Sequence, residues 1–278
     1  MSGPTLMGPT LMGIVNITED SFSDGGRHLD PAAAIAAARR LAASGAGVID
    51  LGAAATNVAA KPVAAAEEIR RLEPVIAALQ ADGIAVSVDS FAPETQRFAL
   101  RRGVDFLNDI EGFAEPALYP ELAEAGCRLV VMHAVHGRGR AQRVAVPAEA
   151  IWVRIAGFFA ARIAALEGAG IDRARLFLDP GMGFFLSTDA AASLRVLAGL
   201  ARLKREFGLP VLVSVSRKSF LAALTGHRGP DALGPATLAA ELYAAANGAD
   251  YIRTHDPGAL RDGLVVTAAL AAAAKPSG

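Results

Sequence analysis

Short apolar runs alternate with longer amphipathic segments along almost the whole chain. The short runs are rich in Val, Ile or Leu and have the length of buried strands, whereas the longer segments carry apolar residues at helical spacing, with charges on the remaining face. Eight runs are predicted as strands, at 12–17, 47–52, 84–89, 104–109, 128–133, 175–179, 211–215 and 250–255. This alternation favours an α/β protein with a single (β/α)8 TIM barrel. A doubly wound open sheet stays open as the alternative, because barrel closure cannot be read from a sequence.

Local signals refine the ends of some segments. Asp30 followed by Pro31 predicts an N-cap and the first residue of a helix, which should stop near Gly45. In the next helical segment Pro74 interrupts the pattern, so it should bend or divide that helix. The longest connection, 133–149, is rich in Gly and Arg, and we expect it to be disordered.

The bulk properties bound the domain organisation. The chain has 278 residues, 53% hydrophobic and only 6% aromatic, which suits one barrel of about 250 residues with Ala-rich helices around it. We assign residues 1–11, which contain the first copy of a tandem GPTLM repeat, to an N-terminal tail and residues 12–274 to the barrel.

Charge, cysteine content and hydropathy exclude several classes of partner. A net charge of −1 provides no basic field for nucleic acid or anionic lipid, so an anionic ligand must be held by local groups. A single cysteine, Cys127, excludes an internal disulfide and fits a reducing compartment. No apolar run reaches the roughly 20 residues that span a bilayer, and the N-terminus has no basic and apolar leader. We therefore expect a cytoplasmic protein that binds neither membrane nor nucleic acid.

Polar residues recur at the carboxyl end of every predicted strand. A single aspartate there is commonly a helix N-cap. In a barrel, however, all these ends converge on one mouth, where the catalytic groups of this fold lie. The in-phase residues are Asn16, Asp50, Asp89, Asn108, Asp109, His133, Asp179, Ser216 to Ser219, Arg253 and His255.

One family carries this set of motifs. The run MGIVNITEDSFSDGG at 12–26 resembles the first loop of dihydropteroate synthases, which usually read MGILNVTPDSFSDGG. Further matching segments are SVDS at 87–90, FLNDI at 106–110, LDPGMGF at 178–184, SRKS at 216–219 and YIRTHD at 251–256, so the resemblance spans residues 6 to about 270. It implies a TIM-barrel transferase of folate biosynthesis. Such an enzyme joins 4-aminobenzoate to 6-hydroxymethyl-7,8-dihydropterin diphosphate and releases pyrophosphate.

The resemblance also assigns the pterin pocket, to Asp89, Asn108, Asp179 and Lys218. A pterin ring edge presents adjacent donors, so Asp179 can accept two charge-assisted hydrogen bonds from it. Asn108 offers both a donor and an acceptor, and Asp89 can take another ring N–H. Asp179 as a plain cap before Pro180 is the structural alternative.

The diphosphate and Mg2+ contacts carry over in the same way, to Asn16, Arg253 and His255. Arg253 and His255 would neutralise the departing pyrophosphate, and Asn16 offers the amide oxygen that Mg2+ accepts. The loss of Arg253 or His255 should therefore lower turnover far more than it disturbs folding. The predicted catalytic set is Asn16, Asp89, Lys218, Arg253 and His255. Asp20 and Asp24 of the first loop are candidates, by charge and place, for shielding the methylene cation left behind.

The predicted 4-aminobenzoate wall comprises Thr56, Val58, Phe185 and Ser219. Two segments in this region depart from the family. GAAATNVA at 52–59 replaces a usual GGESTRPG, and Phe185 and Leu186 replace the glycine and lysine of a common FGKN. These departures resemble the sulfonamide-insensitive branch found on mobile resistance elements, so we expect sulfonamide tolerance. The family resemblance further implies a homodimer packed through helices around 236–270.

Other functions stay open at this point. A pterin-dependent methyltransferase barrel would share the pterin pocket but has no need for the diphosphate residues. A non-catalytic pterin-binding paralogue should have lost several of the catalytic residues, all of which are present here. Lys218 could act as a Schiff-base nucleophile, although Arg217 and Ser219 beside it fit anion and pterin binding better. His133, which ends an apolar run, is more consistent with a structural hydrogen bond than with catalysis.

Overall fold

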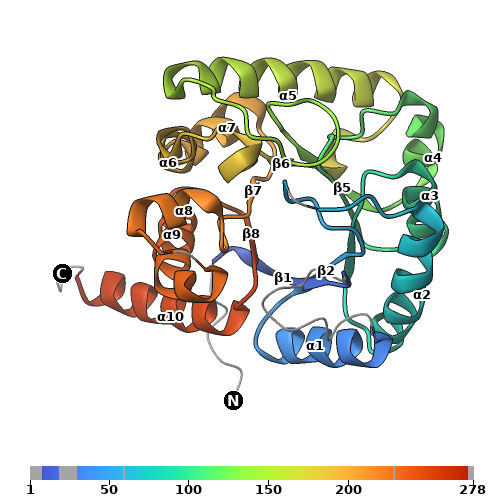
Figure 1. Ribbon diagram of the computed structural model, residues 1–278, viewed down its shortest axis with the longest axis horizontal. Coiled ribbons are helices and arrows are strands. Elements are labelled where there is room, and N and C mark those ends of the chain that lie inside the picture. Colours follow the sequence, from blue (N-terminus) through green and yellow to red (C-terminus); the bar gives the residue numbers. More distant parts are fainter. Residues whose placement is uncertain (1–7, 19–29, 59, 228, 275–278) are drawn as a thin grey trace.

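The computed structural model describes residues 8–18, 30–58, 60–227 and 229–274, in which parallel strands form a ring surrounded by helices (Figure 1). The strand order is β6-β5-β4-β3-β2-β1-β8-β7, and a parallel bridge between Leu178 and Val211 joins the two ends of this sheet. The expected TIM barrel is therefore confirmed over the open sheet. The strands are Thr10–Asn16 (β1), Val48–Gly52 (β2), Val86–Asp89 (β3), Phe106–Asp109 (β4), Arg128–Met132 (β5), Leu176–Asp179 (β6), Leu212–Val213 (β7) and Tyr251–Thr254 (β8).

The helices cover the outside of the ring and bury their apolar faces against it (Figure 1). They are Pro31–Ala43 (α1), Ala65–Ala81 (α2), Pro93–Arg101 (α3), Tyr119–Glu124 (α4), Ile151–Gly168 (α5), Ala190–Ala198 (α6), Leu200–Phe207 (α7), Ser219–Thr225 (α8), Gly234–Ala246 (α9) and Pro257–Ala273 (α10). None of the helices in the described ranges is long and apolar enough to cross a bilayer.

Most predicted boundaries agree with the structure within two or three residues. Asp30 caps α1 by accepting a hydrogen bond from the Ala32 amide, as predicted. The first strand begins at Thr10, two residues before the boundary that we assigned between tail and barrel, because Thr10 pairs with Tyr251 of β8. Only two residues of the predicted 211–215 run form strand β7.

Pro74 was expected to bend or divide α2. It does not divide the helix, which continues through it over 17 residues. Leu72, Val75, Ile76 and Leu79 bury one face of that helix on both sides of the proline, and this packing outweighs the single lost backbone hydrogen bond.

The connection from His133 to Glu149 is ordered by contacts with other loops, against the expectation of disorder. The Ala141 amide donates to the Thr56 carbonyl at 2.9 Å, and the Thr188 amide donates to the Val144 carbonyl at 2.9 Å. The Ser187 hydroxyl bonds both the amide and the carbonyl of Val146, at 3.0 and 2.9 Å. Composition alone could not show these partners, because they lie on other segments.

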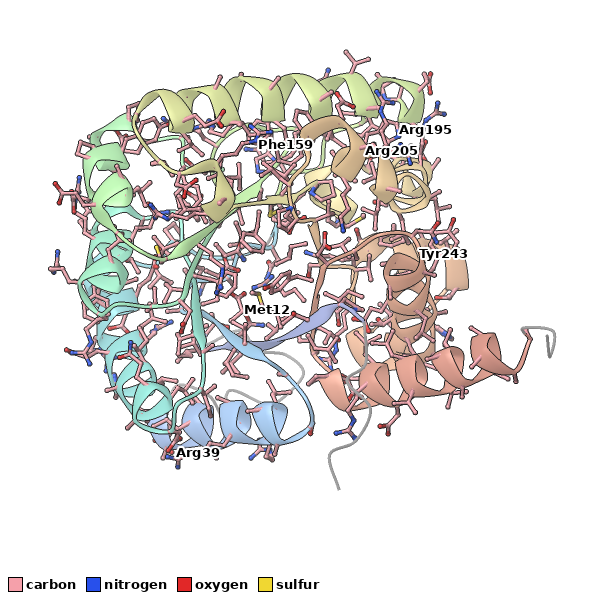
Figure 2. The ribbon with its side chains drawn as sticks, turned by 180° about the vertical axis from the view of Figure 1, so that it is seen from behind. Met12, Arg39, Phe159, Arg195, Arg205 and Tyr243 are labelled. Atoms are coloured by element: carbon pink, nitrogen blue, oxygen red, sulfur yellow. The ribbon has the colours of Figure 1, made fainter. Side chains whose placement is uncertain are left out.

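The interior of the barrel is apolar at the amino ends of the strands. Met12, Val48, Phe106, Val130, Phe177 and Leu212 form one buried cluster there, with Tyr251 packed against it. Met12 lies near the centre of the ring in Figure 2. The rings of Phe106 and Phe177 meet edge to face at 5.6 Å, and those of Phe177 and Tyr251 at 5.1 Å. This plug closes one end of the barrel, so a ligand can enter only from the carboxyl ends of the strands.

Candidate active site

A cavity of about 460 Å³ opens at the carboxyl ends of the strands. Its wall combines strand ends, the loop after β2, the loop after β6 and the turn after β7. A volume of this size matches ordinary ligand pockets. The lining residues are Ile14, Asn16, Thr18, Ala54, Ala55, Thr56, Asn57, Asp89, Ala141, Met182, Phe184, Phe185, Ser214, Ser216, Arg217, Lys218, Ser219, Arg253 and His255.

A smaller, polar pocket of about 20 Å³ lies beside this cavity, deeper in the barrel. It adds Asn108, Ile110, Met132 and Asp179 to seven residues that line both, among them Asp89, Lys218 and Arg253. This space holds roughly one water molecule. A ring system can therefore occupy it only by moving side chains of the shared wall.

Arg253 is held by two carboxylates from neighbouring strands. Its Nε donates to Asp50 of β2, and one of its terminal nitrogens donates to Asp89 of β3 at 2.5 Å. Burial lowers the pKa of the guanidinium, but Asp50 and Asp89 together raise it above its ordinary value. Burial likewise raises the pKa of the Asp89 carboxyl, and Arg253 opposes that rise. The three groups thus form a buried cluster that keeps Arg253 charged.

This cluster gives Arg253 a structural role beside the catalytic role that the sequence predicts. Asp50 is fully buried and Asp89 nearly so, and Arg253 carries the positive charge next to both. Removing one partner of a buried ion pair typically costs about 3–5 kcal/mol, because the remaining charge loses its compensation. Arg253 therefore supports the fold as well as facing the cavity.

Several buried acceptors in or beside the pocket have no hydrogen-bond partner within the described part of the chain. They are Asp50 Oδ1, Asp89 Oδ1 and Asn108 Oδ1. Buried polar atoms are almost always satisfied in folded proteins, so acceptors of this kind indicate a missing donor. Asp89 and Asn108 line the small pocket, and a ligand with ring N–H groups would satisfy them.

Asp179 caps a turn and also lines the small pocket. Its Oδ1 accepts the Gly181 amide at 2.8 Å, as a turn cap would, and the residue also lines the small pocket. Burial raises the pKa of its carboxyl to about 6, against the lowering effects of the Gly181 amide and Lys218. Asp179 is thus mainly ionised near pH 7, with one oxygen available for a ligand.

The LDPGMGF motif has steric reasons for its glycines. Gly181 has φ +74°, and a Cβ there would lie 2.5 Å from the His133 carbonyl oxygen. Gly183 has φ +64°, and its Cβ would lie 2.9 Å from the Ser219 hydroxyl. Only glycine fits both the backbone conformation and the space. The loop after β6 thus lies closely against His133 at the end of β5 and against Ser219 at the start of α8.

Lys218 lies in the shared wall with its ammonium group 5.1 Å from the centre of the Phe185 ring. Burial lowers the pKa of this group to about 8, with Arg253 acting in the same direction and Asp179 and Asp89 opposing. Lys218 therefore remains mostly protonated near pH 7. A charged lysine donates hydrogen bonds but is a poor Schiff-base nucleophile, which weakens the aldolase-like alternative.

His255 is neutral and its orientation is defined. Burial lowers the pKa of its ring to about 3, with Arg217 and Arg253 acting in the same direction. The Ser216 hydroxyl oxygen accepts the His255 backbone amide at 3.3 Å and lies 2.8 Å from ring Nδ1. The hydroxyl hydrogen can then be donated to Nδ1, which places the ring proton on Nε2. His255 thus offers an N–H donor rather than a positive charge.

The structure brings most of the predicted site residues together. Asn16, Thr56, Phe185 and Ser219 line the larger cavity with the charged residues, and Asn108 and Asp179 line the small pocket. Val58 does not line either space, and its side chain is 42% exposed. The structure therefore does not place it in the predicted 4-aminobenzoate wall. Asp20 and Asp24 lie outside the described residues.

His133 is a structural residue here, as its sequence context favoured. Its Nδ1 lies 3.1 Å from the Pro180 carbonyl oxygen, and its ring meets the Phe158 ring edge to face. Burial lowers the pKa of the ring to about 4. Neither of the two spaces is lined by it.

Asp50 was recognised at a strand end but not assigned to the site, and Ser214 and Met182 were missed. Asp50 follows Val48 by two residues, so it points into the barrel directly above the apolar plug. This spacing was a usable signal. Met182 carries no chemistry-bearing atom type that sequence reasoning would select.

Comparison with known proteins agrees with this geometry. Residues 12–255 match the family described as pterin binding enzyme. The chain is 62% identical over 260 residues to the dihydropteroate synthase type-2 of Escherichia coli, which covers 94% of this chain and 95% of that protein. It is 36% identical over 249 residues to the dihydropteroate synthase of Escherichia coli strain K12, with 89% and 86% covered.

A solved structure agrees as well. Dihydropteroate synthase from Xanthomonas albilineans in complex with 7,8-dihydropteroate superposes with a TM-score of 0.82 at 38% identity, over 98% of this chain and 96% of that one. Fold and site define a pterin-binding barrel. The chain belongs to the dihydropteroate synthases, a family of transferases, and to the branch of the type-2 enzyme, as the resemblance implied.

Proposed function

We propose that the chain condenses 6-hydroxymethyl-7,8-dihydropterin diphosphate with 4-aminobenzoate to 7,8-dihydropteroate and pyrophosphate. The observation that carries this proposal is the joining of two unlike sites in one cavity. Carboxylate and amide acceptors without partners lie in the deep pocket, and cationic and N–H donor groups lie at the larger cavity next to it. A pterin ring needs the former and a diphosphate the latter.

In the deep pocket, Asp179 accepts the adjacent N–H groups of the ring edge. Asn108 and Asp89 accept further ring donors with the oxygens that lack partners, and Lys218 donates to the ring carbonyl. The charge-assisted bonds orient the ring so that its methylene carbon faces the larger cavity. The deep pocket has a volume of only about 20 Å³. Binding of the pterin ring therefore requires that side chains such as Lys218 and Met182 move aside.

At the larger cavity, the C–O bond to the diphosphate breaks and negative charge grows on the leaving group. Arg253 uses two of its five N–H donors on Asp50 and Asp89, so others remain for the diphosphate oxygens. His255 donates from Nε2, and Asn16 lines the same wall. The amine of 4-aminobenzoate then attacks the methylene carbon and loses a proton. Donors placed where charge develops are the main catalytic contribution that this arrangement can provide.

Mg2+ fits this donor set as a companion of the substrate rather than as a resident ion. Among the described residues, no group of three His, Cys, Asp or Glu side chains could hold a metal. The amide oxygen of Asn16 at the cavity wall is one hard ligand that could hold it, and Mg2+ commonly takes one or two protein ligands beside substrate phosphates and water. When bound, the ion would neutralise charge on the diphosphate.

We further propose that 4-aminobenzoate occupies the part of the cavity near Thr56, Phe185 and Ser219, and that Phe185 excludes sulfonamides. The Phe185 side chain is buried at the wall, where it packs with Ile110, Met132, Ala134 and Ala141. This support on several sides prevents the ring from yielding to the tetrahedral sulfonyl group. The ring therefore narrows a space that the flat carboxylate of 4-aminobenzoate does not need.

We also propose that the protein is a homodimer in the cytoplasm. The outer faces of α9 and α10 expose Tyr243, Val265, Val266 and Leu270 at 46%, 47%, 58% and 67%. Neighbouring exposed apolar side chains of this kind are typical of protein interfaces. Sedimentation of the purified protein tests the dimer directly.

The decisive experiment measures pyrophosphate release from the pterin diphosphate in the presence of 4-aminobenzoate and Mg2+. We expect release that requires both substrates, with dihydropteroate formed in equal amount. An Asp179→Asn variant is the matched control. No product from the folded wild-type protein would contradict the proposal, and methyl transfer from a methylated pterin would favour the methyltransferase alternative.

A further inference from the structure

The inner face of α9 carries two buried polar residues, Thr237 and Glu241, which are 6% and 2% exposed. They are four residues apart, so they lie one above the other on the same side of the helix. Burying such groups in an apolar core would be unfavourable unless each had a partner. Thr237 bonds the turn after β7 and Glu241 lies next to Thr254 at the end of β8, the two segments that carry the cationic and N–H donor groups of the cavity.

Thr237 supports the turn after β7. Its hydroxyl oxygen accepts the Arg217 backbone amide at 3.1 Å. Arg217 has φ +58°, a left-handed conformation that a side chain with a Cβ rarely adopts. The same turn carries Ser216, which bonds His255, and Lys218 in the wall of the deep pocket. The hydrogen bond from the Arg217 amide to Thr237 can therefore stabilise this unfavourable backbone conformation.

Glu241 supports the end of β8. Its carboxyl group lies next to the side chain of Thr254, the fully buried last residue of that strand, and its Oε1 has no hydrogen-bond partner among the described residues. The Thr254 hydroxyl oxygen accepts the Asp256 amide at 3.1 Å, so its hydrogen is available to the Glu241 carboxyl. Thr254 and Asp256 flank His255. Burial raises the pKa of the Glu241 carboxyl to about 8, so this group is mostly uncharged near pH 7.

We propose that Thr237 and Glu241 are positioning residues for the diphosphate side of the cavity, acting through the Arg217 turn and the end of β8. Neither residue lines the cavity, so neither touches substrate. Arg217 and Lys218 follow β7, and His255 follows β8. Through Thr237 and Glu241, the single helix α9 fixes the positions of these two segments relative to each other. The inference rests on the proposed function, because it assigns these residues to the same reaction.

The test compares Thr237→Val with Thr237→Ser. Valine keeps the shape but removes the acceptor, whereas serine keeps the oxygen. We expect Thr237→Val to raise the KM for pterin diphosphate about tenfold and to change the KM for 4-aminobenzoate less than threefold, and Thr237→Ser to restore wild-type values. Hydrogen exchange at residues 215–219 should be faster in Thr237→Val. Thr225→Val is the matched control, because among the described residues the Thr225 hydroxyl bonds within and just after α8.

A folded Thr237→Val enzyme with an unchanged KM for pterin diphosphate would overturn the inference, as would a Thr237→Ser enzyme as impaired as Thr237→Val. If Thr237→Val does not fold, Glu241 decides. Glu241→Gln, which keeps an acceptor for Thr254, should match the wild type, whereas Glu241→Leu should show the same selective rise in KM. Equal KM values for pterin diphosphate in Glu241→Gln and Glu241→Leu would also overturn the inference. A wild-type protein without any pyrophosphate release would instead contradict the proposed function itself.

Discussion

Two adjacent layers inside the barrel are built on the same strands but have opposite character. The lower layer contains Met12, Val48, Phe106, Val130, Phe177 and Leu212, which pack without polar side chains. Two residues further along the same strands, the side chains include Asp50, Asn108, Asp179, Ser214 and Arg253, and they line the small pocket or pair within it. Because side chains two apart in a strand point the same way, both layers face the barrel axis.

The difference shows that one set of strands provides stability in one layer and binding groups in the next. The lower layer buries apolar surface away from water and so stabilises the fold. The upper layer buries three carboxylates and two cations, each of which is costly to remove from water unless it is paired. It leaves acceptors on Asp89 and Asn108 without partners until a ligand arrives. We predict that substitutions in the two layers separate these contributions, except at Arg253.

Arg253→Ala should have the largest effect, because Arg253 acts in both respects. We expect a loss of about 3–5 kcal/mol in the free energy of unfolding, from the uncompensated Asp50 and Asp89. Turnover of the remaining folded enzyme should fall at least about 100-fold, from the loss of donors to the diphosphate. Urea unfolding and steady-state kinetics measure the two effects. His255→Ala is the comparison, since its neutral ring should affect turnover with little change in stability.

Phe106→Ala should separate the layers in the other direction. The fully buried ring fills the plug, and its removal should cost about 3–5 kcal/mol of unfolding free energy through lost burial and a cavity. The kcat per folded molecule should stay within twofold of the wild type. A kcat that fell in proportion to stability would show that the lower layer also positions the catalytic groups.

Asp179→Asn should lower pterin affinity with little loss of stability. The amide removes one acceptor and presents a donor to the donor edge of the ring, and unsatisfied buried groups cost about 1–3 kcal/mol each. We therefore expect the affinity for the pterin, measured by calorimetry, to fall about 100-fold. Affinity within twofold of the wild type would refute the pocket assignment.

The same variant tests the charge in the upper layer through pH. Burial raises the folded-state pKa of Asp179 to about 6, above the usual value near 4 in an unfolded chain. A raised carboxyl pKa favours folding fully below about pH 4 and loses that contribution as pH rises to about 6. The wild type should thus lose up to about 2–3 kcal/mol relative to Asp179→Asn across this window. A constant difference in unfolding free energy between the two proteins would show that Asp179 does not ionise there.

Phe185→Gly should have the smallest effect, on drug recognition rather than on chemistry. We expect the wild type to tolerate sulfamethoxazole and the variant to be inhibited about tenfold more strongly, which corresponds to about 1.4 kcal/mol. The KM for 4-aminobenzoate serves as the internal control, and Val58→Ala, which changes an exposed side chain off the cavity, should leave inhibition unchanged. Equal insensitivity in Phe185→Gly would move attention to Phe184, which also lines the cavity.

The sequence by itself determined the architecture and most of the site. The alternation of apolar runs and amphipathic segments predicted every strand and favoured a barrel, because strand and helix periodicities are local properties, whereas closure was shown by the bridge between Leu178 and Val211. The phase of polar residues along the strands also placed Asn16, Asp89, Asn108, Asp179, Lys218, Arg253 and His255 at one mouth. Positions within the strands needed no long-range information beyond closure of the barrel.

Tertiary structure alone decided which of these groups act on one another. Arg253 meets Asp50 and Asp89 across 203 and 164 residues of sequence, and no local pattern reports such a pairing. The same holds for three other features: the exposure of Val58, the hydrogen bond from Ala141 to Thr56, and the hydrogen bond from Arg217 to Thr237. Each depends on contacts between segments that only the closed barrel brings together, and those contacts set the charge, orientation and access of the catalytic groups.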